Sequence, residues 1–285
     1  MKNLVIIIIT ILSPILVFSQ NLEVEGRIKA DSIDLNSGLI KNVANPISAQ
    51  DAATKAYVDA MSEMMLDAGL NGIVKDIDGN VYKTIKIGTQ VWMIDNLKTT
   101  HYNEGTAIPE VSDNTSWFNL TTPAYSWYGN DSTTNAQLFG AMYNYYAVSD
   151  TNNINVCPVG WDVPTDSEWT NLTDFLEDSG YGYGGSGSDI GKSMASTFGW
   201  TLSGTTGEIG NDQGSNNSSG FSGFPGGNRS GNGSFFNIGF NGNWWSSSEV
   251  NTSDAWYRFL FYITGFVNRN LSSKGSGFSV RCLRD

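Results

Sequence analysis

The C-terminal stretch, residues 243–285, carries the densest strand signals in the chain and constrains its fold most strongly. Residues 255–262 are apolar or aromatic at nearly every position, which is typical of a strand buried on both faces. In residues 277–285, apolar and polar side chains alternate, which predicts a half-buried strand. Residues 268–274 between them are polar. We therefore predict a core hairpin that carries a polar loop, with the rest of the domain packed around it.

Composition indicates a folded, acidic and loop-rich protein. Aromatic residues make up 12% of the 285 positions and charged residues 15%, which favours an ordered core over disorder. The 32 glycines indicate many tight turns. The formal net charge is −12 and no basic run is present. Nucleic acid is therefore not an expected partner, because its phosphates would be repelled rather than neutralised.

The first 19 residues have the pattern of a secretory signal peptide. Lys2 supplies the positive charge, residues 4–18 form the apolar core, and the predicted cleavage lies before Gln20. The alternative is a retained membrane anchor, but the apolar run is short for a membrane span and is interrupted by Pro14. We expect an exported protein, secreted or at the cell surface, with no membrane span after cleavage.

Residues 20–71 form a separate N-terminal region. Residues 20–47 show short apolar–polar alternations, which predict β-strands that cannot build a core alone. Residues 48–71 predict a helix with a capping pattern from Ser48 to Asp51 and an apolar stripe. Because the stripe has no local partner, self-association predicts a coiled-coil-like oligomerisation segment. Docking of a single helix on the following domain is the alternative.

Residues 38–59 resemble a segment of phage tail fibres and bacterial surface fibres. In those fibres the segment joins a β-structured shaft to a helical trimer region. The resemblance implies that residues 20–71 form a β-rich and helical stalk. It also implies a homo-oligomer, with a trimer as the expected state.

Residues 72–285 contain a series of ordered motifs. They are Trp92-Met93-Ile94-Asp95-Asn96-Leu97, Cys157-Pro158-Val159-Gly160-Trp161, Phe224-Pro225-Gly226-Gly227-Asn228-Arg229, Trp244-Trp245-Ser246-Ser247 and Gly277-Phe278-Ser279-Val280-Arg281-Cys282. The series resembles the Fibrobacter succinogenes major paralogous domain family, which is similar to the C-type-lectin-like fold of formylglycine-generating enzymes and retroelement-diversified proteins. The resemblance implies an α+β head with two helices beside a meandering antiparallel sheet. It implies no particular biochemical activity.

Local signals in the head agree with this plan. Residues 73–93 predict three strands joined by tight turns. Helical spacing predicts a helix over 136–148, and a capping box from Thr165 to Glu168 predicts a second helix. Residues 180–235 are rich in Gly, Ser and Asn, which predicts long loops that are either ordered or partly mobile.

Cys157 and Cys282 are the only cysteines. Two cysteines in an exported chain favour a disulfide, which would contribute roughly 4–5 kcal/mol in the chain-entropy model. The alternative is a catalytic or copper-binding pair, as in formylglycine-generating enzymes. The resemblance disfavours it, because neither cysteine falls at that enzyme's catalytic positions.

Side chains for catalysis or metal binding form no recognisable pattern. His101 is the only histidine, whereas a nucleophilic site needs both a nucleophile and a base. Two cysteines are too few for a cysteine-based zinc site. The acidic turn 76–80 lacks the glycine and bidentate glutamate of a calcium loop. We therefore expect a protein that is not an enzyme and holds no cofactor and no metal.

The tryptophans are expected to lie mainly in the core, because each buries a large area. This prediction applies to Trp161, Trp169, Trp245 and Trp256. Trp244 has polar neighbours and is expected to be more exposed.

Polar side chains around the C-terminal strands can vary without disturbing the core. We therefore predict a ligand-binding face made of Asn243, Trp244, Ser246, Tyr262, Asn268, Asn270, Ser273 and Lys274. Retroelement-diversified proteins of the similar fold place ligand contacts in the corresponding region. The expected partner is a glycan or a protein. The alternatives are a structural surface protein without a specific ligand and, more distantly, an enzyme similar to formylglycine-generating enzymes.

Overall fold

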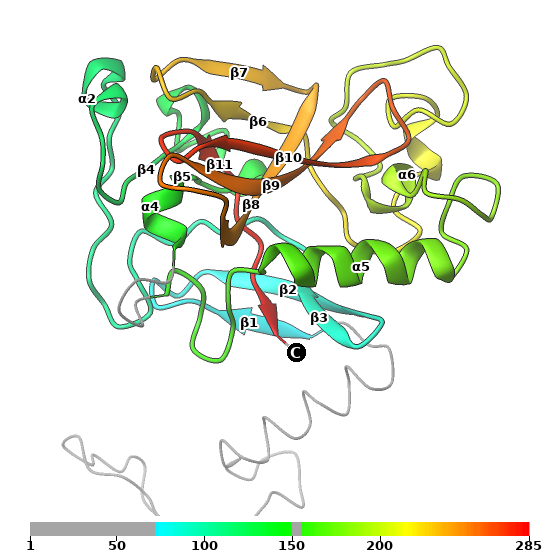
Figure 1. Cartoon of the computed structure of the whole chain (residues 1–285), viewed down its shortest axis with the longest axis horizontal. Helices are drawn as coiled ribbons and strands as arrows, with labels where there is room; N and C mark the ends of the chain where they lie inside the picture. The colour runs from blue at the N-terminus through cyan, green and yellow to red at the C-terminus, as the bar shows by residue number, and fades with distance from the viewer. Residues whose placement is uncertain (1–71, 150–154, 285) are drawn as a thin grey trace, which may run out of the picture. The chain divides into compact units, whose positions relative to one another are not determined.

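The computed structural model describes residues 72–149 and 155–284. The predicted signal peptide (1–19) and the predicted stalk (20–47 and 48–71) lie outside the described residues. Figure 1 shows two sheets with helix α5 (Asp166–Asp178) between them. The described part is thus mixed α+β and dominated by sheet, as expected for the head.

The smaller sheet has four antiparallel strands in the order β1 (Ile73–Lys75), β2 (Val81–Ile87), β3 (Gln90–Met93) and β12 (Leu283–Arg284). Side chains of β2 mostly alternate between solvent and core, and Tyr82 is fully buried. Asp76 shapes the β1–β2 turn by accepting hydrogen bonds from the backbone and side-chain nitrogens of Asn80 and from the Tyr82 hydroxyl. The three strands predicted over 73–93 are confirmed.

The larger sheet has eight strands. Seven follow the order β10-β9-β8-β6-β11-β5-β4, and β7 pairs with β6. Their bounds are β4 (Tyr125–Ser126), β5 (Met142–Asn144), β6 (Gly226–Arg229), β7 (Phe235–Ile238), β8 (Asn241–Glu249), β9 (Asp254–Phe261), β10 (Val267–Ser273) and β11 (Gly277–Phe278). Strands β8, β9 and β10 form an antiparallel meander, so β10 is an edge strand of this sheet (Figure 1).

The C-terminal hairpin differs from the predicted one. Residues 267–273 form the edge strand β10, so most of the polar segment predicted as a loop is strand. The terminal residues do not pair with β9: β11 lies between β5 and β6, and β12 pairs with β3. The backbone of an edge strand forms hydrogen bonds with a neighbouring strand on one side and with water on the other. Polar side chains therefore suit an edge strand as well as they suit a loop. Strand β9 is buried at alternate points rather than throughout.

Helix α5 begins where the capping box predicts. The Thr165 hydroxyl accepts a hydrogen bond from the Glu168 backbone N–H at 3.2 Å, and the Glu168 carboxylate accepts one from the Thr165 backbone N–H at 2.6 Å. Trp169, Leu172 and Leu176 form its buried face. This predicted helix is confirmed.

The helix predicted over 136–148 is wrong, because the chain forms α3 (Ala136–Phe139), strand β5 and α4 (Tyr145–Val148) there. Gly140 ends α3 with φ +70°, and a Cβ at Gly140 would lie 2.6 Å from the Leu97 carbonyl oxygen. This close approach requires glycine and turns the chain out of the helix. The other α-helices described are α2 (Asn114–Phe118) and α6 (Gly191–Met194). Within 72–149 and 155–284, no helix has the length and apolar character needed to cross a membrane.

Two clusters of buried aromatic side chains form the core. The first surrounds Trp245, whose ring contacts Tyr145, Tyr257 and Phe278. The second lies beside α5 and joins Trp92, Trp169, Phe221 and Trp244. The core positions predicted for Trp161, Trp169 and Trp245 are confirmed, since these side chains are at most 6% exposed.

Two tryptophan predictions are wrong. Trp244 is 1% exposed, and its indole N–H donates to Asn96 Oδ1 at 2.8 Å. Its polar neighbours in the sequence are buried as well. Trp256 is half-buried rather than core. The Arg269 guanidinium covers the Trp256 ring at 3.4 Å from the ring centroid, so a cation takes the place of core packing.

Lys192 organises part of the long loops between 180 and 235. Its side chain lies inside the head, and Nζ is 2.5–3.4 Å from four oxygen atoms: the carbonyls of Glu208, Asn211 and Asp212 and the side-chain oxygen of Asn216. Burial lowers the pKa of Lys192. These contacts support the ordered alternative for the loops, because one ammonium group fixes residues 208–216 around itself.

Two buried arginines also donate hydrogen bonds to oxygen atoms of the surrounding loops. Arg281, which is 0% exposed, donates to Asn96 Oδ1 and to the carbonyls of Phe221 and Ser222, and its guanidinium stacks on the Phe221 ring at 4.2 Å. Arg229 is equally buried and donates to the carbonyls of residues 111, 112 and 233. Burial lowers the pKa of Arg281 to about 9 and that of Arg229 to about 10, so both remain charged at neutral pH. Arg229 thus connects β6 to the loops at 111–112 and 233, and Arg281 connects the C-terminal segment to the loop at 221–222.

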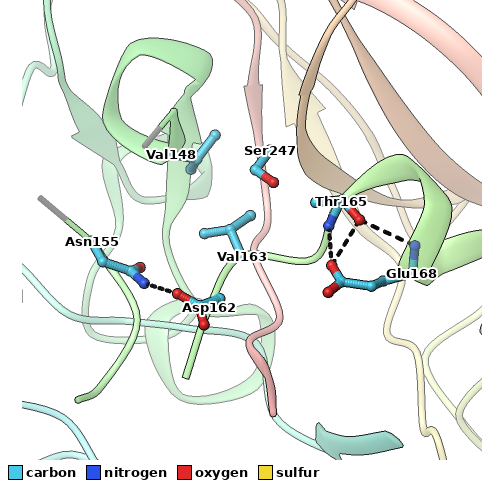
Figure 2. A pocket seen from close by; sticks show the side chains of 7 residues that line it. All are labelled: Val148, Asn155, Asp162, Val163, Thr165, Glu168 and Ser247. Atoms are coloured by element: carbon cyan, nitrogen blue, oxygen red, sulfur yellow. Dashed lines mark hydrogen bonds between the residues drawn. The ribbon is translucent and has the colours of Figure 1, made fainter. Parts of the chain in front are cut away.

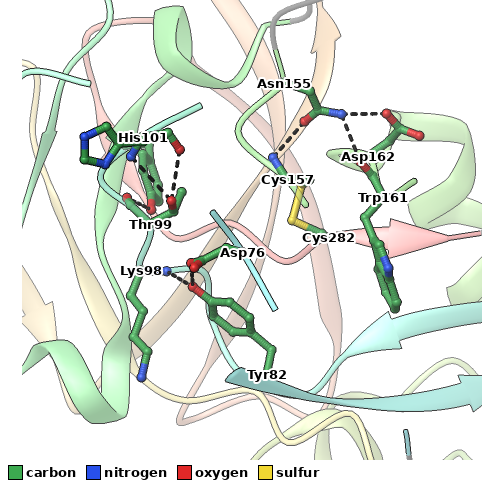
Figure 3. The surroundings of a disulfide bond; sticks show 11 residues. Asp76, Tyr82, Lys98, Thr99, His101, Asn155, Cys157, Trp161, Asp162 and Cys282 are labelled. Atoms are coloured by element: carbon green, nitrogen blue, oxygen red, sulfur yellow. Dashed lines mark hydrogen bonds between the residues drawn. A yellow bond between two sulfur atoms is a disulfide. The ribbon is translucent and has the colours of Figure 1, made fainter. Parts of the chain in front are cut away.

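The predicted disulfide between Cys157 and Cys282 is confirmed (Figure 3). Both sulfurs are buried, with a Cα–Cα distance of 5.8 Å. Asn155 holds the nearby turn: its Oδ1 accepts from the Cys157 N–H, and its Nδ2 donates to the Trp161 carbonyl. The bond therefore ties the turn that follows residue 155 to the C-terminal segment.

Replacing both cysteines by alanine should lower the free energy of unfolding by roughly 4–5 kcal/mol. The disulfide joins residues 125 positions apart and so reduces the conformational entropy of the unfolded chain. Denaturant titration of wild type and C157A/C282A measures this difference. Mass spectrometry without reductant should also show the linked peptides. Free thiols in protein purified without reductant, or equal stability of the double variant, would contradict the assignment.

Lys192→Met should lower the free energy of unfolding by about 2–3 kcal/mol, because it leaves buried oxygens without a donor. Lys75→Met is the matched control: Lys75 is exposed on β1, and a surface change usually stays within about ±0.5 kcal/mol. Thermal and denaturant unfolding of both variants provide the comparison. Equal stability of the two variants would show that the ammonium does not hold the loops.

Candidate functional site

Four of the eight predicted ligand residues are buried, which corrects the expectation that they face a ligand. Asn243, Trp244, Ser246 and Lys274 are at most 7% exposed. Asn243 donates to the Gly227 carbonyl, Ser246 to the Trp256 carbonyl, and Lys274 to Glu249 at 2.7 Å. Strand β8 is an inner strand, so its polar side chains bond within the protein instead of meeting solvent.

The other four predicted residues lie on or beside β10 with at least partial exposure. Asn270 and Ser273 are exposed, while Tyr262 and Asn268 are half-buried. Tyr262 packs against the second core cluster and the Phe240 ring. Only Asn268 and Asn270 share one face of β10, because they are two residues apart. The structure therefore brings together two of the eight.

Aromatic side chains of β9 complete a surface with these two asparagines. Asn268 lies directly opposite Phe259, and Asn270 directly opposite Tyr257. Directly opposite residues project to the same face of a sheet, and so does Phe261, two positions further along β9. All five side chains are half-buried or exposed. We call Tyr257, Phe259, Phe261, Asn268 and Asn270 the aromatic–amide strip.

The strip combines apolar rings with hydrogen-bonding amides. Tyr257 and Phe259 stack with 5.6 Å between ring centroids and 24° between planes. Tyr257 also contacts Phe278 of the core at 4.6 Å, so the strip is supported from within. A ligand could place apolar groups on the rings while the amides donate and accept hydrogen bonds. The sequence prediction missed the aromatic members because it assigned residues 255–262 to the interior on both faces.

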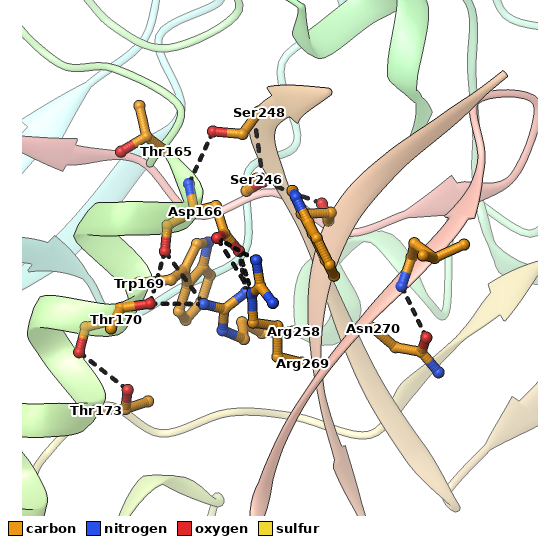
Figure 4. Close-up of polar contacts among 12 residues, drawn as sticks. Thr165, Asp166, Trp169, Thr170, Thr173, Ser246, Ser248, Arg258, Arg269 and Asn270 are labelled. Carbon is orange, nitrogen blue, oxygen red and sulfur yellow. Dashed lines mark hydrogen bonds and ion pairs between the residues drawn. The ribbon is translucent and has the colours of Figure 1, made fainter. Parts of the chain in front are cut away.

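The opposite face of β9 and β10 is clamped to α5 (Figure 4). The Asp166 carboxylate binds Arg258 of β9 at 2.6 Å and Arg269 of β10 at 2.8 Å. Burial acts to raise the pKa of Asp166, but hydrogen bonds from Arg269 and Arg258 outweigh it and hold the pKa below its usual value. The β9–β10 hairpin is therefore fixed on one face and presents the strip on the other.

A cavity of about 220 Å³ lies at the N-terminal end of α5 (Figure 2). It is lined by Val148, Asn155, Asp162, Val163, Thr165, Glu168 and Ser247. The Glu168 carboxylate accepts hydrogen bonds from Thr165, and Asp162 accepts one from Asn155 at 2.6 Å. These bonds cap the helix and fix the turn, so the polar side chains of this cavity are explained by the fold.

A second cavity, of about 290 Å³, lies at the turn that joins β9 to β10. Residues 263–266 of that turn form one wall, and residues from the loops at 183–189 and 206–208 form the others. Tyr183 and Phe266 are about half exposed in it. It combines aromatic, hydroxyl and carboxylate groups from separate parts of the chain.

His101 lies in the surroundings of the disulfide (Figure 3). It pairs with Asp78. Its Nδ1 is 2.6 Å from Asp78 Oδ1 and 3.0 Å from the Thr100 hydroxyl. A catalytic triad needs the nucleophile and the carboxylate on different ring nitrogens, whereas both groups here contact the same one. Within the described ranges, no three acidic, histidine or cysteine side chains gather in a way that could hold a metal ion. The absence of catalysis stays a prediction.

Comparison with known proteins places the chain in a family. A family model described as the Fibrobacter succinogenes major domain matches residues 85–284, which include the whole larger sheet, α5 and both cysteines. No curated protein and no solved structure matches the chain. Since the family model spans more than half of the sequence, the chain belongs to the Fibrobacter succinogenes major domain family.

Proposed function

We propose that the protein is an exported binding protein that presents the aromatic–amide strip to a ligand outside the cell or at its surface. The observation that carries the proposal is the strip itself: aromatic and amide side chains paired across β9 and β10 on one accessible face. Partly exposed rings that are grouped and bordered by polar amides support an interaction site. The proposed ligand is a glycan or a protein, and the protein has no catalytic role.

The support beneath the strip suits a recognition surface. The Asp166 clamp holds the hairpin from one face, and the contact between Tyr257 and Phe278 holds it from the core. A surface that is already rigid loses little conformational freedom when it binds. The C-type-lectin-like fold proposed for the head would agree with this use of one end of a sheet.

The N-terminal region completes the proposal. The apolar core of residues 1–19 supports export, and the fibre-like residues 20–71 support an oligomeric stalk, proposed as a trimer. Several heads on one stalk would bind a repetitive target by avidity, so each head could bind weakly. This arrangement suits adhesion to a cell surface or a polymer.

A triple variant, F259A/N268A/N270A, should lose at least about tenfold in affinity while it stays folded. The change removes one ring and both amides from the strip, and tenfold corresponds to about 1.4 kcal/mol. Binding is measured on arrays of glycans and of extracellular proteins, with affinities of each hit by interferometry. The control is F118A/L202A, which removes two exposed apolar side chains elsewhere, 66% and 82% exposed. If the wild type binds a target that the triple variant binds equally well, the strip is the wrong surface.

Residues 20–71 should make the chain oligomeric. Light scattering should give a multimer, expected to be a trimer, for residues 20–285 and a monomer for 72–285, because only the longer chain contains the apolar stripe of 48–71. A monomer for the longer chain at micromolar concentration would favour the docked-helix alternative.

A further inference from the structure

The cavity at the β9–β10 turn, which we call the tip pocket, has apolar walls that remain open to solvent. Tyr183, Ile263 and Phe266 line it and are 46%, 43% and 50% exposed. They come from two distant parts of the chain, so the fold assembles them at one place. Large apolar side chains grouped around a hollow indicate a binding site more often than single exposed ones do.

Polar side chains also line the tip pocket, beside these apolar ones. Asp189 Oδ1 accepts the Tyr183 backbone N–H at 3.0 Å, while Oδ2 receives no hydrogen bond from the described residues. Thr206 is exposed at the cavity, and the Glu208 carboxylate accepts a hydrogen bond from the Ser203 hydroxyl. The pocket therefore offers an oriented carboxylate oxygen and a hydroxyl group beside aromatic rings.

The walls are held in place by the backbone. The Gly265 carbonyl accepts a hydrogen bond from the Gly191 N–H at 2.6 Å, and the Thr264 carbonyl accepts one from the Ile209 N–H at 3.1 Å. The buried Lys192 ammonium donates to the carbonyl of Glu208, a lining residue, at 3.3 Å. A ligand would therefore meet a formed cavity, without first ordering these loops.

The charges of the pocket select the type of ligand. Asp189 and Glu208 provide two carboxylates that line it, and Lys192 places one positive charge at the Glu208 carbonyl. The remaining negative charge, with −12 for the chain, disfavours an anion. The Lys192 charge and the hydrogen bonds already made by both carboxylates also weaken the attraction for a cation. A neutral ligand with several hydroxyl groups and an apolar face fits best.

We infer that the tip pocket binds one neutral pyranose ring of a carbohydrate, an inference that rests on the proposed function of the head as a binding module. The C–H face of the sugar packs on Tyr183 and Phe266, and its hydroxyls donate to Asp189 Oδ2 and pair with Thr206. The site is separate from the aromatic–amide strip and would add a second contact for a longer glycan.

The test is saturation-transfer difference NMR of the full chain with methyl glycosides of glucose, galactose, mannose and N-acetylglucosamine. At least one glycoside should receive saturation on its ring protons. Tyr183→Ala and Asp189→Asn should each weaken that binding at least tenfold. The asparagine keeps the acceptor for the Tyr183 N–H, so Asp189→Asn should fold normally. Leu202→Ala, at an 82% exposed site outside the pocket, should leave binding unchanged.

Several outcomes would overturn the inference or the proposed function separately. If no glycoside binds, or if Nα-acetyl-lysine methylamide binds instead, the inference is overturned. Glycoside binding that survives both pocket variants but disappears in F259A/N268A/N270A also overturns it, while the proposed function stands. In another outcome, glycoside binding is lost in both pocket variants while the targets found on the arrays bind F259A/N268A/N270A as tightly as wild type. That result supports the inference and shows that the strip is not the recognition surface. Melting temperatures of all variants confirm that each is folded.

Discussion

Buried cations held by neutral oxygens are the interaction on which the head depends. Lys192, Arg229 and Arg281 bond mainly to backbone carbonyls, and none of the three has a carboxylate within ion-pair distance among the described residues. Each carbonyl dipole contributes a partial negative charge, and an aromatic ring adds to this for both arginines. An ionised side chain in the interior is costly unless all its donors are paired, so the surrounding loops must keep one conformation. This requirement gives long glycine-rich loops a defined shape with little secondary structure of their own.

The rigid scaffold explains why recognition is expected at the β9–β10 hairpin. One face of the hairpin is bound to α5 through Asp166, and its aromatic members contact the core through Tyr257. The strip lies on the other face, and the tip pocket lies where the hairpin turns against the loops that Lys192 organises. Side chains in these places can change without affecting the buried cations or the disulfide. Stability and binding are therefore provided by different sets of side chains.

Local rules predicted the parts of the fold that depend on neighbouring residues. The capping box predicted the start of α5, turn chemistry predicted β1–β3, and the presence of only two cysteines, with the predicted signal peptide, led to the predicted disulfide. Predictions failed where distant contacts decide. The close approach of Gly140 to Leu97 interrupts the helix expected over 136–148. Trp244 is buried, and its indole N–H is paired with Asn96 in the interior. Of the predicted ligand residues, Asn268 and Asn270 lie together, but only the strand register shows that aromatic rings stand opposite them. Sequence alone could not distinguish a polar edge strand from a polar loop.

We propose that the β9–β10 hairpin is the recognition surface of a rigid head. Hydrogen–deuterium exchange of the full chain, alone and with the first glycan or protein found to bind it, tests this most directly. An edge strand leaves part of its amides unpaired, so exchange there is fast in the free protein and sensitive to a bound partner. On binding, exchange should slow mainly in residues 254–273, with little change in α2 and α3. Protection confined to α2, α3 or the cavity at the start of α5, with residues 254–273 unaffected, would contradict it.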